Sequence, residues 1–155
     1  MTGKIDARLA ELGIELPTPP APAAAYVPFV KAAGLVYISG QVSMGPDGLI
    51  KGKLGADTEI EAGAAAARTS AIALLAQLKV ACDGDLDRVK KVVKLTGFVN
   101  STPDFPDHPK VINGCSELMV AVFGAEIGSH ARSAFGVANL PFGVATEVEG
   151  VFEIA

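Results

Sequence analysis

One apolar segment of the chain carries charged side chains of the types that bind and transform small carboxylates. The segment is "SHARSAFGVANLPFGVATEVEGVFEI", residues 129–154, with Arg132 near its start and Glu147, Glu149 and Glu153 near its end. An arginine guanidinium is a rigid fork that suits a carboxylate, and a glutamate can position or deprotonate a water molecule. The segment therefore holds the groups needed for water attack on a substrate that bears a carboxylate.

Alternation within this segment predicts two strands, about 130–138 and 144–154, and decides which side chains share a face. Arg132 shares its face only with small residues, which leaves a hollow beside the guanidinium: Ala134, Gly136 and Ala138. If the two strands form a hairpin with its turn at 139–140, Arg132 lies across from Glu147. The alternative interpretation of these two residues is a structural ion pair at a subunit interface.

Hydrophobic periodicity and turn residues predict the elements that position this segment. The expected order is a helix over 3–13, a Pro-rich arm, strands over 26–31 and 34–42, a helix over 58–81, a strand over 88–100, a helix over 109–123 and the two strands above. Asp57 or Thr58 is the expected N-cap of the second helix, and Pro109 the expected first residue of the third. Along 88–100, the expected shared face is Val89, Lys91, Val93, Leu95, Gly97 and Val99.

This order predicts an α+β fold, a mixed and mainly antiparallel sheet with two helices packed on one face. We expect residues 1–25 to form an N-terminal helix and arm, and residues 26–155 to form a single domain. The strands carry apolar residues on both faces, so the face without helices must meet solvent or another subunit. A second subunit is favoured, which predicts a homo-oligomer.

Composition excludes several classes of protein. The net charge of −4 argues against a nucleic-acid partner, and no apolar run approaches the roughly 18 residues that a membrane span needs. Two cysteines, Cys82 and Cys115, are too few for a disulfide scaffold and fit a reducing cytoplasm. The histidines, His108 and His130, have no metal-ligand spacing, and "GPDG" at 45–48 is a turn rather than a phosphate loop.

Four short motifs carry a resemblance to a known family. They are "ISGQV" at 38–42, "ARS" at 131–133, "ANLP" at 138–141 and "TEVEGVFEI" at 146–154. In this combination and order the chain, from about Tyr26 to its end, resembles the RidA/YjgF family of reactive-intermediate (enamine/imine) deaminases. The resemblance implies a chorismate-mutase-like α+β domain that forms homotrimers with sites in the clefts between subunits.

The resemblance also implies roles for individual residues. Arg132 matches the arginine that binds the substrate carboxylate, and Glu147 the glutamate that positions the attacking water. Five further positions match residues that line the pocket: Tyr26, Ser39, Gly40, Asn113 and Ala134. The backbone near Ala134 would help to hold the water, and the family often carries a cysteine there. Neither a metal nor a cofactor is implied, because an imine is already electrophilic.

The leading hypothesis is hydrolytic deamination of 2-aminoacrylate-like enamines or imines to 2-keto acids and ammonia. The partner would be a small carboxylate-bearing imine or keto acid. A non-catalytic trimer that binds small carboxylates or regulates through them is the alternative. Ribonuclease activity is disfavoured by the acidic charge, and chorismate mutase activity is suggested by the fold alone. Glu149, Glu153 and His130 have no assigned role.

Overall fold

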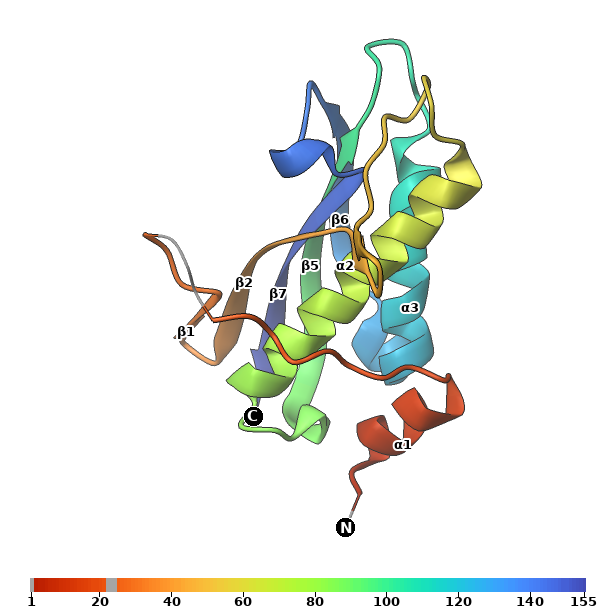
Figure 1. Cartoon of the computed structure of the whole chain (residues 1–155). Helices are drawn as coiled ribbons and strands as arrows, with labels where there is room; N and C mark the ends of the chain where they lie inside the picture. The colour runs from red at the N-terminus through yellow and green to blue at the C-terminus, as the bar shows by residue number, and fades with distance from the viewer. Residues whose placement is uncertain (1, 22–24) are drawn as a thin grey trace.

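The elements follow one another largely as the periodicity predicts. A computed structural model describes residues 2–21 and 25–155 (Figure 1). The helices are α1 (Lys4–Glu11), α2 (Ile60–Ala81) and α3 (His108–Gly128). The strands are β1 (Phe29–Ala32), β2 (Leu35–Val42), β3 (Met44–Gly45), β4 (Gly48–Leu49), β5 (Val89–Asn100), β6 (Ala131–Val137) and β7 (Thr146–Ile154). The expected turn at 45–48 joins β3 to β4, and the Ala-Gly turn joins β1 to β2, with positive φ at Ala33 and Gly34.

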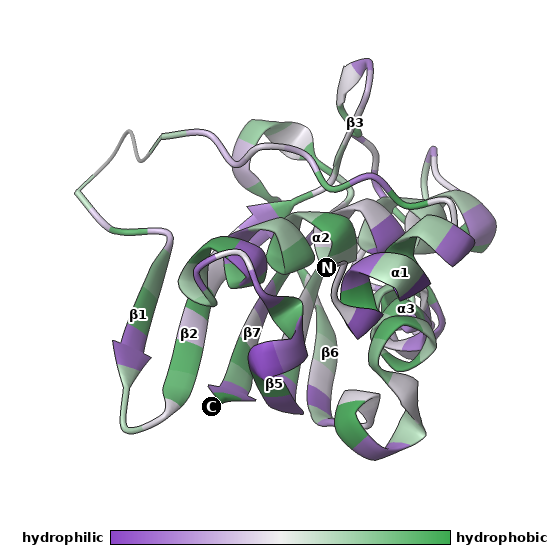
Figure 2. Ribbon diagram, turned by 90° about the horizontal axis from the view of Figure 1, so that it is seen from below, coloured by the Kyte–Doolittle hydropathy of each residue, from purple (hydrophilic) through white to green (hydrophobic). Residues whose placement is uncertain are grey.

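One sheet organises the fold, with strand order β1-β2-β7-β5-β6. Its neighbours pair antiparallel except β5 and β6, which run parallel. Parallel neighbours need a crossover connection, and α3 supplies it. Figure 2 shows the strands fanning out from β1 to β6 with α2 lying across one side of the sheet. The predicted α+β class, with α2 and α3 on one face of a mixed sheet, is confirmed.

The predicted hairpin between the last two strands is wrong. β5 lies between β6 and β7, so Arg132 is paired with Leu95, and Glu147 with Phe98. A hairpin assumes that consecutive strands are neighbours, whereas the α3 crossover adds β6 at the edge of the sheet. The connection after β6 includes a short turn, Pro141–Gly143, and leads β7 back into the gap between β2 and β5.

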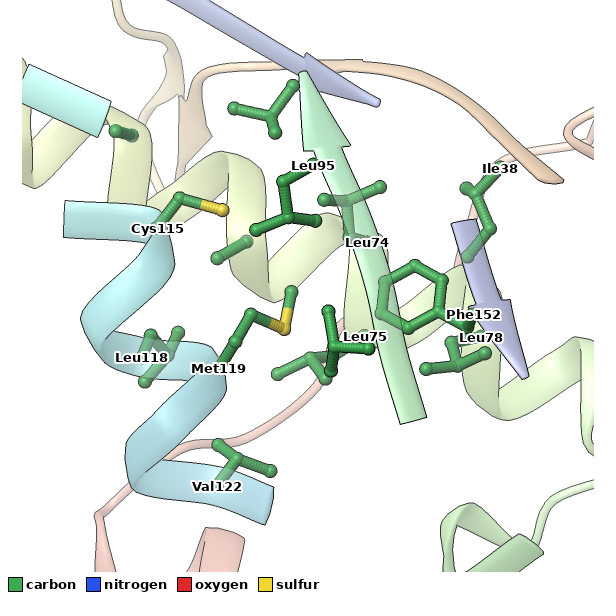
Figure 3. Close-up of a cluster of buried hydrophobic side chains, with 14 of the residues drawn as sticks. Ile38, Leu74, Leu75, Leu78, Leu95, Cys115, Leu118, Met119, Val122 and Phe152 are labelled. Carbon is green, nitrogen blue, oxygen red and sulfur yellow. The ribbon is translucent and has the colours of Figure 1, made fainter. Parts of the chain in front are cut away.

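The core lies between the sheet and the two long helices, as Figure 3 shows for α2, α3, β5 and β7. Its largest fully buried side chains include Leu74, Leu75, Leu78, Leu95, Ile112, Met119 and Phe152. Small residues bring the two helices together. A Cβ at Gly114 of α3 would collide with the carbonyl oxygen of Ala64 on α2, so only glycine permits this approach.

The start of α2 differs from the prediction. Its N-cap is Glu59, which makes no side-chain capping hydrogen bond. The Asp57 carboxylate instead accepts hydrogen bonds from the Lys53 backbone N–H (2.6 Å) and the Thr58 hydroxyl (2.9 Å). Both residues predicted as caps therefore close the preceding turn, and the backbone at Glu59 begins the helix.

The faces of β5 also differ from strict alternation. Register shifts interrupt its pairing with β7 between Val89 and Lys91, and again between Val92 and Lys94. Val92 is therefore buried, while Val93 is 36% exposed. The predicted face holds at Val89 and from Leu95 onward, because alternation resumes after the second bulge.

Helix α3 begins at His108, one residue before the predicted Pro109, and it reaches Gly128 rather than 123. Gly124 interrupts it with φ of 80°. Among the described residues, α3 alone has the length and apolar composition of a membrane-crossing helix. Its buried side chains contact α2 and the sheet, which is the environment of a core helix.

The N-terminal segment is bound to the domain at several points. The Asp87 carboxylate accepts hydrogen bonds from the backbone N–H groups of Lys4 (2.9 Å) and Ile5 (2.8 Å), which cap α1. Leu9 and Ile14 are buried in the main core. Residues 15–21 then cross α2 as an extended arm (Figures 1 and 2).

Replacing Asp87 by alanine should destabilise the protein through the loss of this cap. The expected loss is about 1 kcal/mol, equivalent to roughly 2–4 °C in Tm. Hydrogen bonds from the backbone N–H of Ile5, the larger cause, and from that of Lys4 lower the pKa of Asp87 below its ordinary value of 3.8. The stabilisation is therefore present above that pH and is lost as the pH falls through the lower, folded-state pKa.

Thermal unfolding of wild type and Asp87→Ala at pH 7 and at decreasing pH measures this difference. Asp104→Ala, at an exposed aspartate in a loop, is the matched control. An Asp87→Ala difference that persists unchanged at the lowest pH would contradict the capping role.

Candidate functional site

Arg132 projects from β6, the edge strand of the sheet, toward α3. Its Nη1 donates to the Asn113 side-chain oxygen (2.8 Å) and lies 3.2 Å from the Ser116 hydroxyl oxygen. Asn113 and Ser116 are three residues apart on α3, so both face the same point of the strand. The structure thus brings together two of the predicted site residues, Arg132 and Asn113.

The guanidinium keeps part of its hydrogen-bonding edge open. No carboxylate oxygen of the described residues lies within 4.0 Å of an Arg132 nitrogen. Among the described residues, the guanidinium of Arg132 donates hydrogen bonds through Nη1 only. Nε and Nη2 form the edge that binds a carboxylate through two parallel bonds. Arg132 is therefore held in place without being neutralised.

The small residues beside Arg132 also serve packing. Ala134 lies on the same face and packs against the core. A Cβ at Gly136 would meet the Ser101 hydroxyl and the His108 ring, so that part of the expected hollow is filled.

Neither cysteine is suited to act as a nucleophile. Cys115 lies on α3 between Asn113 and Ser116 and is fully buried. Burial raises the pKa of its thiol to about 12, although the positive charge of Arg132 acts in the opposite direction. The pKa of the buried Cys82 is also raised, mainly by burial. Both thiols therefore stay protonated at neutral pH.

Glu147 lies on β7 and points to the sheet face that the helices leave open. Its neighbours on the strand, Thr146 and Val148, are fully buried on the opposite side. A Cβ at Gly40 of β2 would collide with the Glu147 carboxylate, so the glycine makes room for it. Burial, and then the negative charge of Glu149, raise the pKa of Glu147.

Four of the predicted residues line one cavity of about 400 Å³: Tyr26, Ser39, Gly40 and Glu147. It lies along β2 beyond the end of β1, where the β2 edge has no strand partner. The Ser39 hydroxyl donates to the Val27 carbonyl (2.8 Å), which ties the segment before β1 to the cavity wall. Pro17–Ala21 of the arm, Phe142 and Gln77 line the same cavity.

The predicted site residues therefore form two groups in one chain. Arg132, Asn113 and Ala134 lie at the β6 edge on the helix-covered side. Tyr26, Ser39, Gly40 and Glu147 lie around the β2 edge. With β5 between them and the sheet separating their faces, Arg132 and Glu147 of one chain cannot contact the same small molecule.

Sequence reasoning missed Ser116, His130 and the arm residues 17–21. Ser116 follows Asn113 at helical spacing, so a search of the same helix face would have found it. His130 precedes Arg132 by two residues, and its ring contacts Gly128 and Ser116 of α3. The position of the arm depends on the docking of α1, which no local pattern predicts.

The fold and these residues define a member of a known family. Residues 6–150 match the family described as "YjgF/chorismate mutase-like, putative endoribonuclease". The chain therefore belongs to the YjgF family, as the motif resemblance predicted.

Particular relatives cover nearly the whole chain. It is 47% identical over 154 residues to "Protein TCP17" of Trypanosoma cruzi, covering 99% of this chain and 96% of that protein. The crystal structure of Atu1372 from Agrobacterium tumefaciens, described as of unknown function, matches with a TM-score of 0.90 and 41% identity, over 97% of this chain and 92% of that one. The crystal structure of "a putative endoribonuclease" from Shewanella oneidensis matches with a TM-score of 0.90 and 32% identity, over 97% of this chain and 99% of that one.

Replacing Glu149 by glutamine should lower the pKa of Glu147, because it removes the neighbouring negative charge. The pKa should stay above its ordinary value, because burial is the larger cause. Carboxyl ¹³C NMR as a function of pH measures it, with Glu153→Gln, further along β7, as the control. An equal shift in both variants would contradict the specific effect of Glu149.

Because the folded-state pKa of Glu147 is raised, its ionisation opposes folding. This contribution to stability is favourable at low pH and is lost as the pH rises through the interval between the unfolded and folded pKa values. Glu147→Gln should therefore flatten the decrease in Tm over that interval.

Proposed function

We propose that the protein hydrolyses reactive enamine or imine intermediates of the 2-aminoacrylate kind to 2-keto acids and ammonia. The observation that carries the proposal is Arg132, held through Nη1 by two neutral side chains, with an Nε–Nη2 edge that makes no hydrogen bond to the described residues. Such a fork suits the carboxylate that an amino-acid-derived imine carries. Membership of the YjgF family supports the same assignment.

The reaction asks little of the protein beyond positioning. Arg132 holds the substrate carboxylate, and Glu147 orients a water toward the imine carbon. Water adds to the C=N bond, and the resulting amino alcohol expels ammonia as the C=O bond forms. A carboxyl with a raised pKa can accept the proton of the water and return it to the leaving nitrogen. The backbone at Ala134 is proposed to help hold the water.

A complete site on this proposal needs two copies of the chain, since Arg132 and Glu147 lie on different faces. The open face of the sheet carries exposed apolar side chains: Val30 (51%), Tyr37 (48%) and Phe135 (43%). Phe135 also stacks edge to face on Phe98, with ring centroids 5.4 Å apart. Such a face favours coverage by another subunit. We propose a homotrimer with the site between subunits. The two free thiols of each chain, Cys82 and Cys115, fit a cytoplasmic location.

Ammonia release from enzymatically generated 2-aminoacrylate tests the activity. Arg132→Ala should lower kcat/KM on the order of 100-fold, because two charge-assisted hydrogen bonds to the substrate are lost. Arg132→Lys should be intermediate, because it keeps the charge without the fork. Arg68→Ala, at an exposed arginine on α2, is the control. Equal rates for wild type and Arg132→Ala would refute the proposal.

Mixing two inactive variants tests whether the site is shared. Co-refolded Arg132→Ala and Glu147→Ala chains should recover about a quarter of wild-type activity if each site takes Arg132 from one copy and Glu147 from the next. No recovery in mixed oligomers, verified by two different affinity tags, would contradict a site that combines Arg132 of one copy with Glu147 of the next.

A carboxylate-binding protein without turnover is the second candidate, because the same Arg132 edge accounts for it. Calorimetric titration with 2-oxobutyrate separates the two: binding without ammonia release from any imine supports this candidate. The name of the Shewanella oneidensis relative raises ribonuclease activity. The net charge of −4 counts against it, and RNA cleavage that Arg132→Ala abolishes would favour it.

A further inference from the structure

A chain of hydrogen bonds leads from Arg132 back to the connection between α3 and β6. The Ser116 hydroxyl oxygen lies 3.2 Å from Arg132 Nη1 and 2.9 Å from His130 Nε2. The other ring nitrogen, His130 Nδ1, lies 2.7 Å from the carbonyl oxygen of Gly128. The side chains of Arg132, Ser116 and His130 are all partly buried.

The carbonyl oxygen of Gly128 fixes the direction of the hydrogen bonds along this chain. A carbonyl oxygen only accepts, so His130 Nδ1 carries the proton that it shares with Gly128. In the neutral ring, Nε2 is then an acceptor, and the Ser116 hydroxyl donates to it. The lone pairs of that hydroxyl consequently face Arg132 Nη1.

We propose that His130, acting through Ser116, is a positioning residue for Arg132. This inference rests on the proposed role of Arg132 as the carboxylate anchor. Nη1 has two protons, and Ser116 and Asn113 accept one each. The plane of the guanidinium is thereby fixed, and its Nε–Nη2 edge is presented in one orientation.

The chemistry of the three supporting groups explains why they suit this task. Asn113, Ser116 and His130 carry no negative charge, so they orient the guanidinium without competing with a substrate carboxylate. An aspartate or glutamate at position 113 or 116 would instead place a negative charge beside Nη1 and neutralise Arg132. A flexible arginine without them would lose conformational freedom on binding, which weakens affinity.

Two alanine variants and one conservative variant test the positioning role. His130→Ala and Ser116→Ala should each raise the Kd for 2-oxobutyrate, and the KM for the imine, by about 3- to 10-fold. Their kcat should change less than about 2-fold, because Glu147 is untouched. Ser116→Thr keeps a hydroxyl and should restore wild-type Kd. Ser129→Ala, at the exposed neighbour of His130, is the control.

A spectroscopic measurement does not depend on turnover. In ¹⁵N-labelled protein, the Nε–Hε resonance of Arg132, assigned by its absence in Arg132→Lys, should move in His130→Ala and Ser116→Ala and stay in place in Ser129→Ala. The thermal unfolding of each variant shows that it is folded.

The possible outcomes distinguish a failure of the positioning role from a failure of the proposed function. If Arg132→Ala abolishes 2-oxobutyrate binding while both alanine variants bind as wild type does, the positioning role is overturned and the proposed function stands. If Arg132→Ala binds as wild type does, the anchor role fails, and an unmoved Nε–Hε resonance then overturns the positioning role as well. Equal losses in Ser116→Thr and Ser116→Ala also overturn it, since the hydroxyl is then irrelevant.

Discussion

The parallel pairing of β5 with β6 determines where the rest of the molecule lies. Two consecutive strands can run parallel only if the chain crosses back over the sheet, and α3 makes that crossing. The crossing brings Asn113 and Ser116 over Arg132. It also leaves the position between β2 and β5 for β7, which places Glu147 on the opposite face. The separation of the two charged groups is thus a consequence of topology.

The two groups have opposite electrostatic surroundings. Arg132 is contacted through Nη1 by neutral oxygen atoms and retains its charge for an anion. Glu147 sits near Glu149 in a partly buried position, which favours its protonated form. If Arg132 of a neighbouring copy approached Glu147, the positive charge would lower the pKa of the carboxyl again. In the proposed homotrimer, assembly would then set the protonation state of Glu147.

Local sequence patterns predicted most helices and strands and the faces of the strands. They could not predict which strands pair, because pairing depends on contacts between distant segments. The alternation around Arg132 required only the period of a strand, and it agrees with the structure. Strand order depends on contacts between distant segments, so the hairpin to Glu147 was wrong. The burial of Val92 was missed because a bulge shifts alternation without a marking residue.

The candidate site shows the same limits. Tyr26, Ser39 and Gly40 line the same cavity as Glu147, and Asn113 accepts a hydrogen bond from Arg132, while their assignment to a site stays a prediction. That the two groups occupy different edges of the sheet could not be predicted, because the motifs do not encode which strands are neighbours.

The N-terminal arm connects two properties that are usually separate. Its residues 17–21 line the cavity that contains Glu147, while the helix before it contributes Leu9 and Ile14 to the core. A substitution that shifts α1 therefore also shifts one wall of the cavity, because the arm follows the helix directly. The shape of the cavity and the folding free energy are thus coupled through a single segment of the chain.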